Sequence, residues 1–179
     1  MSTLKVDSIL DTSGNDTVAG KILQVQYTIN TTYSSQAFAT NSTEAIDNMS
    51  VNITPSSTSS KIFLQANWFG EFSNQVGSYN GMWGFLRDST RVFPFNSGES
   101  RTYGISASNI SYWGNQNVNT PEGAFIHYVD APASTSQITY KLCWTGSAYT
   151  MYHNRPVTDN NTAGYERGTS MIIAMEIAG

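Results

Sequence analysis

Apolar and polar residues alternate with a period of two along most of this chain. Leu23, Val25, Tyr27 and Ile29 alternate with glutamine and threonine, which predicts a strand with one buried face. The same pattern predicts further strands, separated by turn-forming residues, for a total of roughly nine or ten. These other segments are residues 46–53, 61–69, 81–87, 91–95, 101–113, 125–129, 138–144, 149–153 and 169–177.

The alternation also assigns residues to faces. Ile62, Leu64, Ala66 and Trp68 share one face of their segment, as do Ile138, Tyr140, Leu142 and Trp144. Aromatic side chains on such faces bury a large area, so we expect the tryptophans to fill a core. The apolar face of a later segment consists of Phe125, His127 and Val129.

The fold class follows from this list of elements. No segment of ten or more residues has a helical period, and no repeat of fixed length is visible, which disfavours propellers and solenoids. We predict an all-β protein, an antiparallel jelly-roll β-sandwich over residues 21–179. Residues 1–20 contain too few apolar positions to form a core and are predicted to be an attachment or trimerisation arm.

One strand indicates self-association. Residues 171–175 read Met-Ile-Ile-Ala-Met, which is apolar on both faces of a strand and therefore needs a cover on its outer side. A second subunit is the natural cover. The candidate interface residues are Leu4, Val6, Ile9, Leu23, Val25, Tyr27, Met171, Ile173 and Met175.

Composition narrows the possible partners. Almost a third of the 179 residues are serine, threonine or asparagine, and charged residues are only 12%, against about 25% in average soluble domains. The net charge is −4 and the nine basic residues are scattered, so nucleic acid is not an expected partner. We expect no signal peptide and no membrane-inserted helix. The single cysteine, Cys143, is predicted to be a small buried residue.

Candidate catalytic chemistry is sparse. His127 and His153 are 26 positions apart with no nearby cysteine or histidine, so neither a catalytic triad nor a metal site is predicted. One metal route stays open, in which three copies of one histidine meet on a three-fold axis. The glutamates are isolated, unlike the paired carboxylates of glycosidases. Glu176 lies within the last strand, where an arginine such as Arg87 is a possible partner. We expect no enzyme activity and no cofactor.

Sugar binding is a more plausible activity, because saccharides are held by aromatic faces and amide hydrogen bonds. Two loops combine these groups, and Trp113 is the residue that we most expect to be exposed. The alternative is a rim aromatic that caps one end of the sandwich. The candidate glycan-binding residues are Trp113, Tyr112, Asn115, Asn74, Tyr79 and Asn80.

Several segments resemble a group of viral proteins. Residues 2–9 with 11–14, 53–62, 84–90 and 175–179 read STLKVDSI, DTSG, ITPSSTSSKI, GFLRDST and MEIAG. They resemble small virion and tail-fibre proteins of marine and cyanobacterial tailed phages. That resemblance implies a fibre, knob or decoration protein, usually a homotrimer with a jelly-roll head. The strand count and the terminal strand are also similar to the trimeric jelly rolls of the tumour-necrosis-factor and complement C1q type, at the level of fold only.

The sequence therefore predicts a non-enzymatic virion protein, exposed on the particle surface as a short trimeric tail fibre or spike head. Its arm would bind another virion protein, and host surface glycan is a possible ligand. Two alternatives remain: a capsid decoration or knob protein, and a carbohydrate-binding adhesin module.

Overall fold

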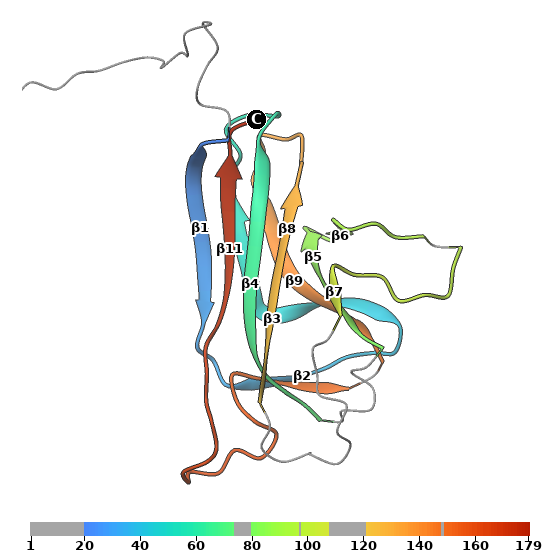
Figure 1. Cartoon of the computed structure of the whole chain (residues 1–179), viewed down its shortest axis with the longest axis vertical. Helices are drawn as coiled ribbons and strands as arrows, with labels where there is room; N and C mark the ends of the chain where they lie inside the picture. The colour runs from blue at the N-terminus through green and yellow to red at the C-terminus, as the bar shows by residue number, and fades with distance from the viewer. Residues whose placement is uncertain (1–19, 74–79, 97, 108–120, 148) are drawn as a thin grey trace, which may run out of the picture.

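The computed structural model describes residues 20–73, 80–96, 98–107, 121–147 and 149–179. Within them the chain is entirely β, without a helix, and its eleven strands form two antiparallel sheets (Figure 1). The all-β prediction is confirmed. The first sheet contains β1 (Ile22–Asn30), β2 (Ser34–Ala37), β4 (Lys61–Phe72), β8 (Glu122–Asp130), β10 (Thr150–His153) and β11 (Ser170–Ile177). The second contains β3 (Ser42–Ile53), β5 (Met82–Arg87), β6 (Thr90–Arg91), β7 (Ser106–Ala107) and β9 (Ile138–Gly146).

Four long strands make up most of the first sheet, in the order β1, β11, β4 and β8, and lie side by side in Figure 1. The C-terminal end of β4 pairs with β10 instead of β11, and β10 pairs with β2 on its other edge. In the second sheet β9 lies between β3 and β5, while the short β6 and β7 pair with β5. The two sheets enclose one core between them.

The core contains aromatic side chains from both sheets. Trp68 of the first sheet lies 5.1 Å from Trp83 of the second, and Trp83 lies 5.0 Å from Trp144, between ring centroids. Each of the three is 1% exposed, as the strand alternation predicted. Gly81 is required beside them, because a Cβ atom there would lie 1.7 Å from the Trp144 ring.

Two predicted faces point the other way. Val25, Tyr27 and Ile29 in β1, and Phe125 and Val129 in β8, are among the most exposed apolar side chains of the described chain. The expectation that the apolar face of β1 is buried is therefore wrong for the single chain. Alternation identifies which residues share a face, but it does not say which face meets the core. The inward positions of β1 hold the polar residues Gln24, Gln26 and Thr28. Those of β8 hold Ala124, Ile126 and Tyr128, which pack in or against the core.

Several strand boundaries differ from the predicted ones. The strand predicted over 91–95 is only the two-residue β6, Thr90–Arg91, and β3 begins at Ser42 instead of residue 46. The short strand β2 was missed, since Ser34–Ala37 lacks an apolar alternation. The strand predicted over 101–113 is described only as the two-residue β7, with residues 108–120 outside the described part. Within β3, pairing with β9 is interrupted between Ala45 and Ser50, where Asn48 has a φ of 59°.

A strap over the second sheet creates a small second core. This strap (residues 92–96 and 98–105) leads from β6 to β7, and its Phe93 packs on the outer side of the sheet with Leu86 and Cys143. Gly84 leaves room for Phe93, because a Cβ at Gly84 would lie 2.3 Å from that ring. Cys143 is fully buried, as predicted, and burial raises the pKa of its thiol to about 12.

A buried carboxylate fixes the C-terminal strand. Glu176 is 0% exposed, and its partner is not Arg87 as expected from the sequence. Gln24 Nε2 donates to Oε2 at 2.6 Å, while the Ser56 N–H and hydroxyl donate to Oε1 at 2.7 and 2.6 Å. The Ser60 hydroxyl adds a fourth bond at 2.7 Å. β11 is thereby tied to β1 and to the turn between β3 and β4.

This carboxylate should make stability depend on acid pH. Burial alone would raise its pKa, but the four hydrogen bonds outweigh burial and lower the pKa of Glu176 from 4.5 to about 2. Its contribution is therefore complete above about pH 4.5 and is lost as the pH falls towards 2. We expect Glu176→Gln to unfold at lower temperature at pH 7, because its amide group cannot accept all four bonds.

The measurement is thermal unfolding from pH 7 down to pH 2, with Glu166→Gln as a control that makes the same charge change at an exposed position. Wild type and the control should lose stability steeply in the window below pH 4.5, and Glu176→Gln should lose less. Parallel pH profiles for all three proteins would contradict this role.

Candidate functional site

The outer surface of the first sheet is rich in apolar side chains, with Gln65, Asn67 and His127 among them, and we call it the outer apolar face. Strand register places Val25, Met175, Phe63 and Val129 in one row across β1, β11, β4 and β8. The next two rows also start with apolar side chains from β1 and β11. These rows are Tyr27, Ile173, Gln65 and His127, and then Ile29, Met171, Asn67 and Phe125.

This outer apolar face exposes large side chains. Tyr27 is 64% exposed and Phe125 is 73% exposed, while Val25, Ile29 and Val129 are about half exposed. None of the three rows contains an aspartate, glutamate, lysine or arginine. Monomeric proteins rarely expose contiguous apolar patches above a few hundred Å². A face with these properties is suited to contact with another apolar surface.

Most of the predicted interface residues that the structure describes lie on this face. Val25 and Tyr27 are on it, together with the half-buried Met171, Ile173 and Met175. Leu23 is at the irregularity where the β1–β11 register shifts, and it is 41% exposed. Leu4, Val6 and Ile9 lie outside the described residues. The contributions of Phe63, Phe125 and Val129 were missed, although their alternation was recognised.

A polar groove lies on the second sheet, beside the strap. Two adjoining pockets of about 520 and 310 Å³ share Asn41, Ser100, Arg101 and Thr102, and we call the two together the Arg101 groove. The larger pocket is also lined by Asn80, Gly81, Met82, Gly146 and Ser147. The smaller one is also lined by Arg91, Phe95, Glu99, Tyr103 and Thr145.

Contacts among the strap residues, and between the strap and Arg91 of β6, hold the charged groups of this groove. The Arg91 guanidinium lies 4.0 Å above the centroid of the Phe95 ring, and Phe95 meets Tyr103 edge-on at 5.6 Å. The Tyr103 hydroxyl donates to Glu99, which raises the pKa of that hydroxyl. Arg101 is the most exposed of these side chains at 82%, and its Nε lies 3.6 Å from a Glu99 oxygen.

Of the predicted glycan-binding residues, Asn80 is described, and it lines the Arg101 groove. Asn74, Tyr79, Tyr112, Trp113 and Asn115 lie outside the described residues. The remaining groove residues were missed because they come from four distant segments of the chain. Arg91 and Arg101 are ten positions apart, and the sequence shows them only as part of its scattered positive charge.

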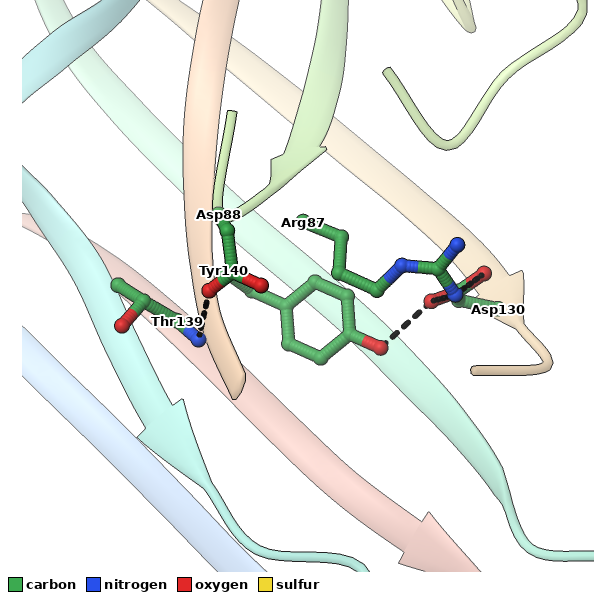
Figure 2. A network of polar contacts seen from close by, with 5 residues as sticks. All are labelled: Arg87, Asp88, Asp130, Thr139 and Tyr140. Carbon is green, nitrogen blue, oxygen red and sulfur yellow. Dashed lines mark hydrogen bonds and ion pairs between the residues drawn. The ribbon is translucent and has the colours of Figure 1, made fainter. Parts of the chain in front are cut away.

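A network of ionisable groups joins the two sheets at one end (Figure 2). Arg87 of β5 donates to Asp130 of β8 at 3.1 Å, and the Tyr140 hydroxyl of β9 donates to the same oxygen at 2.5 Å. Burial and this hydrogen bond raise the pKa of Tyr140 well above its ordinary value. Beside them the Thr139 N–H donates to Asp88 at 3.0 Å, within the turn after β5. The network is structural, because it clamps β8 against β5 and β9.

The two histidines have different surroundings. His153 is fully buried, and its Nδ1 accepts a hydrogen bond from Trp68 Nε1 at 2.9 Å. Burial, followed by the charge of Arg155, lowers the pKa of His153 to about 4, so the ring is neutral at pH 7. His127 is exposed on the outer apolar face, 6.5 Å from the Phe63 ring. No group of three or more metal-binding side chains occurs among the described residues.

Comparisons with known proteins leave the chain without an assigned family. A scan against protein-family models finds no match, and a search of curated proteins finds no significant similarity. Over the described residues, no helix has the length and apolar character needed to cross a membrane.

The inter-sheet network leads to a stability prediction. Asp130→Asn removes the charge that pairs with Arg87 and weakens the bond from Tyr140, so we expect a loss of about 1–3 kcal/mol in the free energy of unfolding. Chemical denaturation measures this loss. The matched control is Asp159→Asn, which removes a two-bond pair with Arg167 inside one loop. It should change stability less, because that pair joins no separate strands. Equal losses in the two variants would contradict the clamp.

Proposed function

We propose that this protein is a non-enzymatic structural protein of a phage particle, the head of a short homotrimeric tail fibre or spike. It would be exposed on the virion, with the arm of residues 1–20 bound to another virion protein. The phage assignment is based on the sequence resemblance of residues 2–14, 53–62, 84–90 and 175–179. The assembly is supported by one structural observation, the uncharged outer apolar face.

Burial of that face would stabilise an assembly strongly. Its five most exposed side chains each offer on the order of 100 Å², or about 500 Å² together. At about 25 cal/mol per Å², their burial is worth on the order of 10 kcal/mol per subunit before the costs of association.

The order of the strands supports a jelly-roll head. Successive long strands alternate between the sheets, with β1, β4, β8 and β11 in the first and β3, β5 and β9 in the second. The resulting orders, β1-β11-β4-β8 and β3-β9-β5-β6, are consistent with two interlocked Greek keys. The choice of three subunits follows from the phage resemblance.

Two alternative functions use the same surfaces differently. A capsid decoration or knob protein would place the apolar face against its own copies or against a capsid protein. A carbohydrate-binding adhesin is favoured by a specific observation, the Arg101 groove on the other sheet, which stays accessible when the apolar face is covered. The apolar face needs a partner in all three cases and does not separate them, so we rank the fibre or spike head first on the sequence resemblance alone.

The interface proposal predicts a mass and a way to change it. The purified protein should have a light-scattering mass near three times 19.6 kDa. Tyr27→Asp places a charge in the middle row of the outer apolar face, on the edge strand β1. We expect it to yield mainly monomers, because a buried unpaired charge costs several kcal/mol.

Phe95→Asp is the matched control, since Phe95 is an exposed aromatic residue in the strap beside the other sheet. It should remain a trimer. Trimers that persist in Tyr27→Asp, or a monomeric wild type, would refute assembly through this face.

Attachment through the arm can be tested separately. A chain without residues 1–20 should give a folded, soluble head that is not incorporated into phage particles. The measurements are circular dichroism, mass and the protein content of purified particles. An unfolded head, or normal incorporation, would contradict the arm assignment.

A further inference from the structure

The Arg101 groove combines three kinds of recognition group. Asn41, Asn80, Ser100 and Thr102 line it with amides and hydroxyls, which suit a ligand rich in hydroxyl groups. Phe95 provides an aromatic ring that is 51% exposed. Arg91 and Arg101 provide positive charge in a chain whose net charge is −4. A small anion would need only the last of these.

The acidic residue of the groove does not neutralise its arginines. One Glu99 oxygen accepts from Asn96 at 3.1 Å, and the other accepts from the Tyr103 hydroxyl. Its contact with Arg101 is a long one at 3.6 Å between exposed groups, which contributes little binding energy. The end of the Arg101 guanidinium therefore stays available to a ligand, while Glu99 serves to hold the strap in shape.

Arg91 and Arg101 differ in their contacts and in their exposure. Arg91 is held on one side of the Phe95 ring at 4.0 Å and fixes the orientation of that ring. Arg101 is 82% exposed, and its planar fork fits a carboxylate through two parallel hydrogen bonds. The two adjoining pockets give the groove the length to hold more than one sugar unit.

From these contacts we propose that the Arg101 groove binds an acidic oligosaccharide, with a ligand carboxylate on Arg101 and sugar rings against Phe95 and the amides of Asn41 and Asn80. This site is complete within one chain and does not depend on the proposed virion function. It would give a fibre head or an adhesin the same specificity for carboxylated glycans.

The test compares two ligands with the same sugar units, one with free carboxylates and one with the carboxylates esterified. Trigalacturonic acid and its neutral methyl ester are titrated into the full-length protein by calorimetry. The acid should bind about tenfold more tightly than the ester, equivalent to about 1.4 kcal/mol. Arg101→Gln should remove this preference, and Arg101→Lys should retain only part of it, because lysine keeps the charge without the fork.

Two controls separate the site from general effects. Arg167→Gln makes the same change in net charge outside the groove and should bind as wild type. Phe95→Leu should weaken both ligands alike, because it removes the ring and not the charge. Thermal unfolding checks that every variant is folded. If a variant at Arg101 does not fold, Arg101→Ser replaces it, and if Phe95→Leu does not fold, Phe95→Met replaces it.

Several results would overturn the proposal. Equal affinity for acid and ester would do so, as would unchanged binding by Arg101→Gln. Absence of binding at low-millimolar trigalacturonate, sialyllactose and hyaluronan tetrasaccharide would exclude an acidic glycan site. Displacement of trigalacturonate by equimolar phosphate would reduce the groove to a simple anion site. None of these outcomes depends on whether the protein is trimeric, so failure here is distinct from failure of the interface proposal.

Discussion

Both faces of the β1-β11-β4-β8 sheet carry large apolar side chains, and the core covers only one of these faces. The inner face packs Ile62, Leu64 and Trp68 against the second sheet. On the outer face, Val25, Tyr27 and Phe125 meet water in the single chain. This imbalance is the constraint from which the assembly proposal follows, because water is a poor cover for uncharged, ring-rich surface.

The polar groups of the sandwich stabilise this arrangement from inside. Glu176 points away from the outer face, and its four hydrogen bonds hold β11 in the register that places Met171, Ile173 and Met175 outward. At the end of β8, Asp130 joins the first sheet to Arg87 and Tyr140 of the second. Buried charge thus appears where it fixes strand position and is absent from the three rows of the outer face.

Sequence alternation predicted most of the strands, but not which face of each strand meets the core. It placed Trp68, Trp83 and Trp144 in the core correctly, because each lies on the more apolar face of its strand and that face packs inward. In β1 and β8 the same signal failed, because a surface covered by another subunit has the same pattern as a core. The apolar run at 171–175 was the clue to this ambiguity, and it pointed to a cover on the outer side.

The Arg101 groove could not be predicted in the same way. Its residues come from the turn at Asn41, the start of β5, the strap and the end of β9. No local spacing joins these segments, and the apolar and polar pattern does not predict that the Arg91 guanidinium stacks on the Phe95 ring. Asn80 was predicted from the amide-rich composition of its loop. That composition does not indicate which other residues lie beside it in the groove.

Hydroxyl-radical footprinting of the wild-type protein tests the central claim most directly. In the single chain Tyr27 and Phe125 are more exposed, at 64% and 73%, than Tyr33 and Phe95, at 49% and 51%. If copies of the chain cover the outer apolar face, Tyr27 and Phe125 will be oxidised more slowly than Tyr33 and Phe95. Oxidation of Tyr27 and Phe125 at the faster rates expected from their exposure in the single chain would contradict the account.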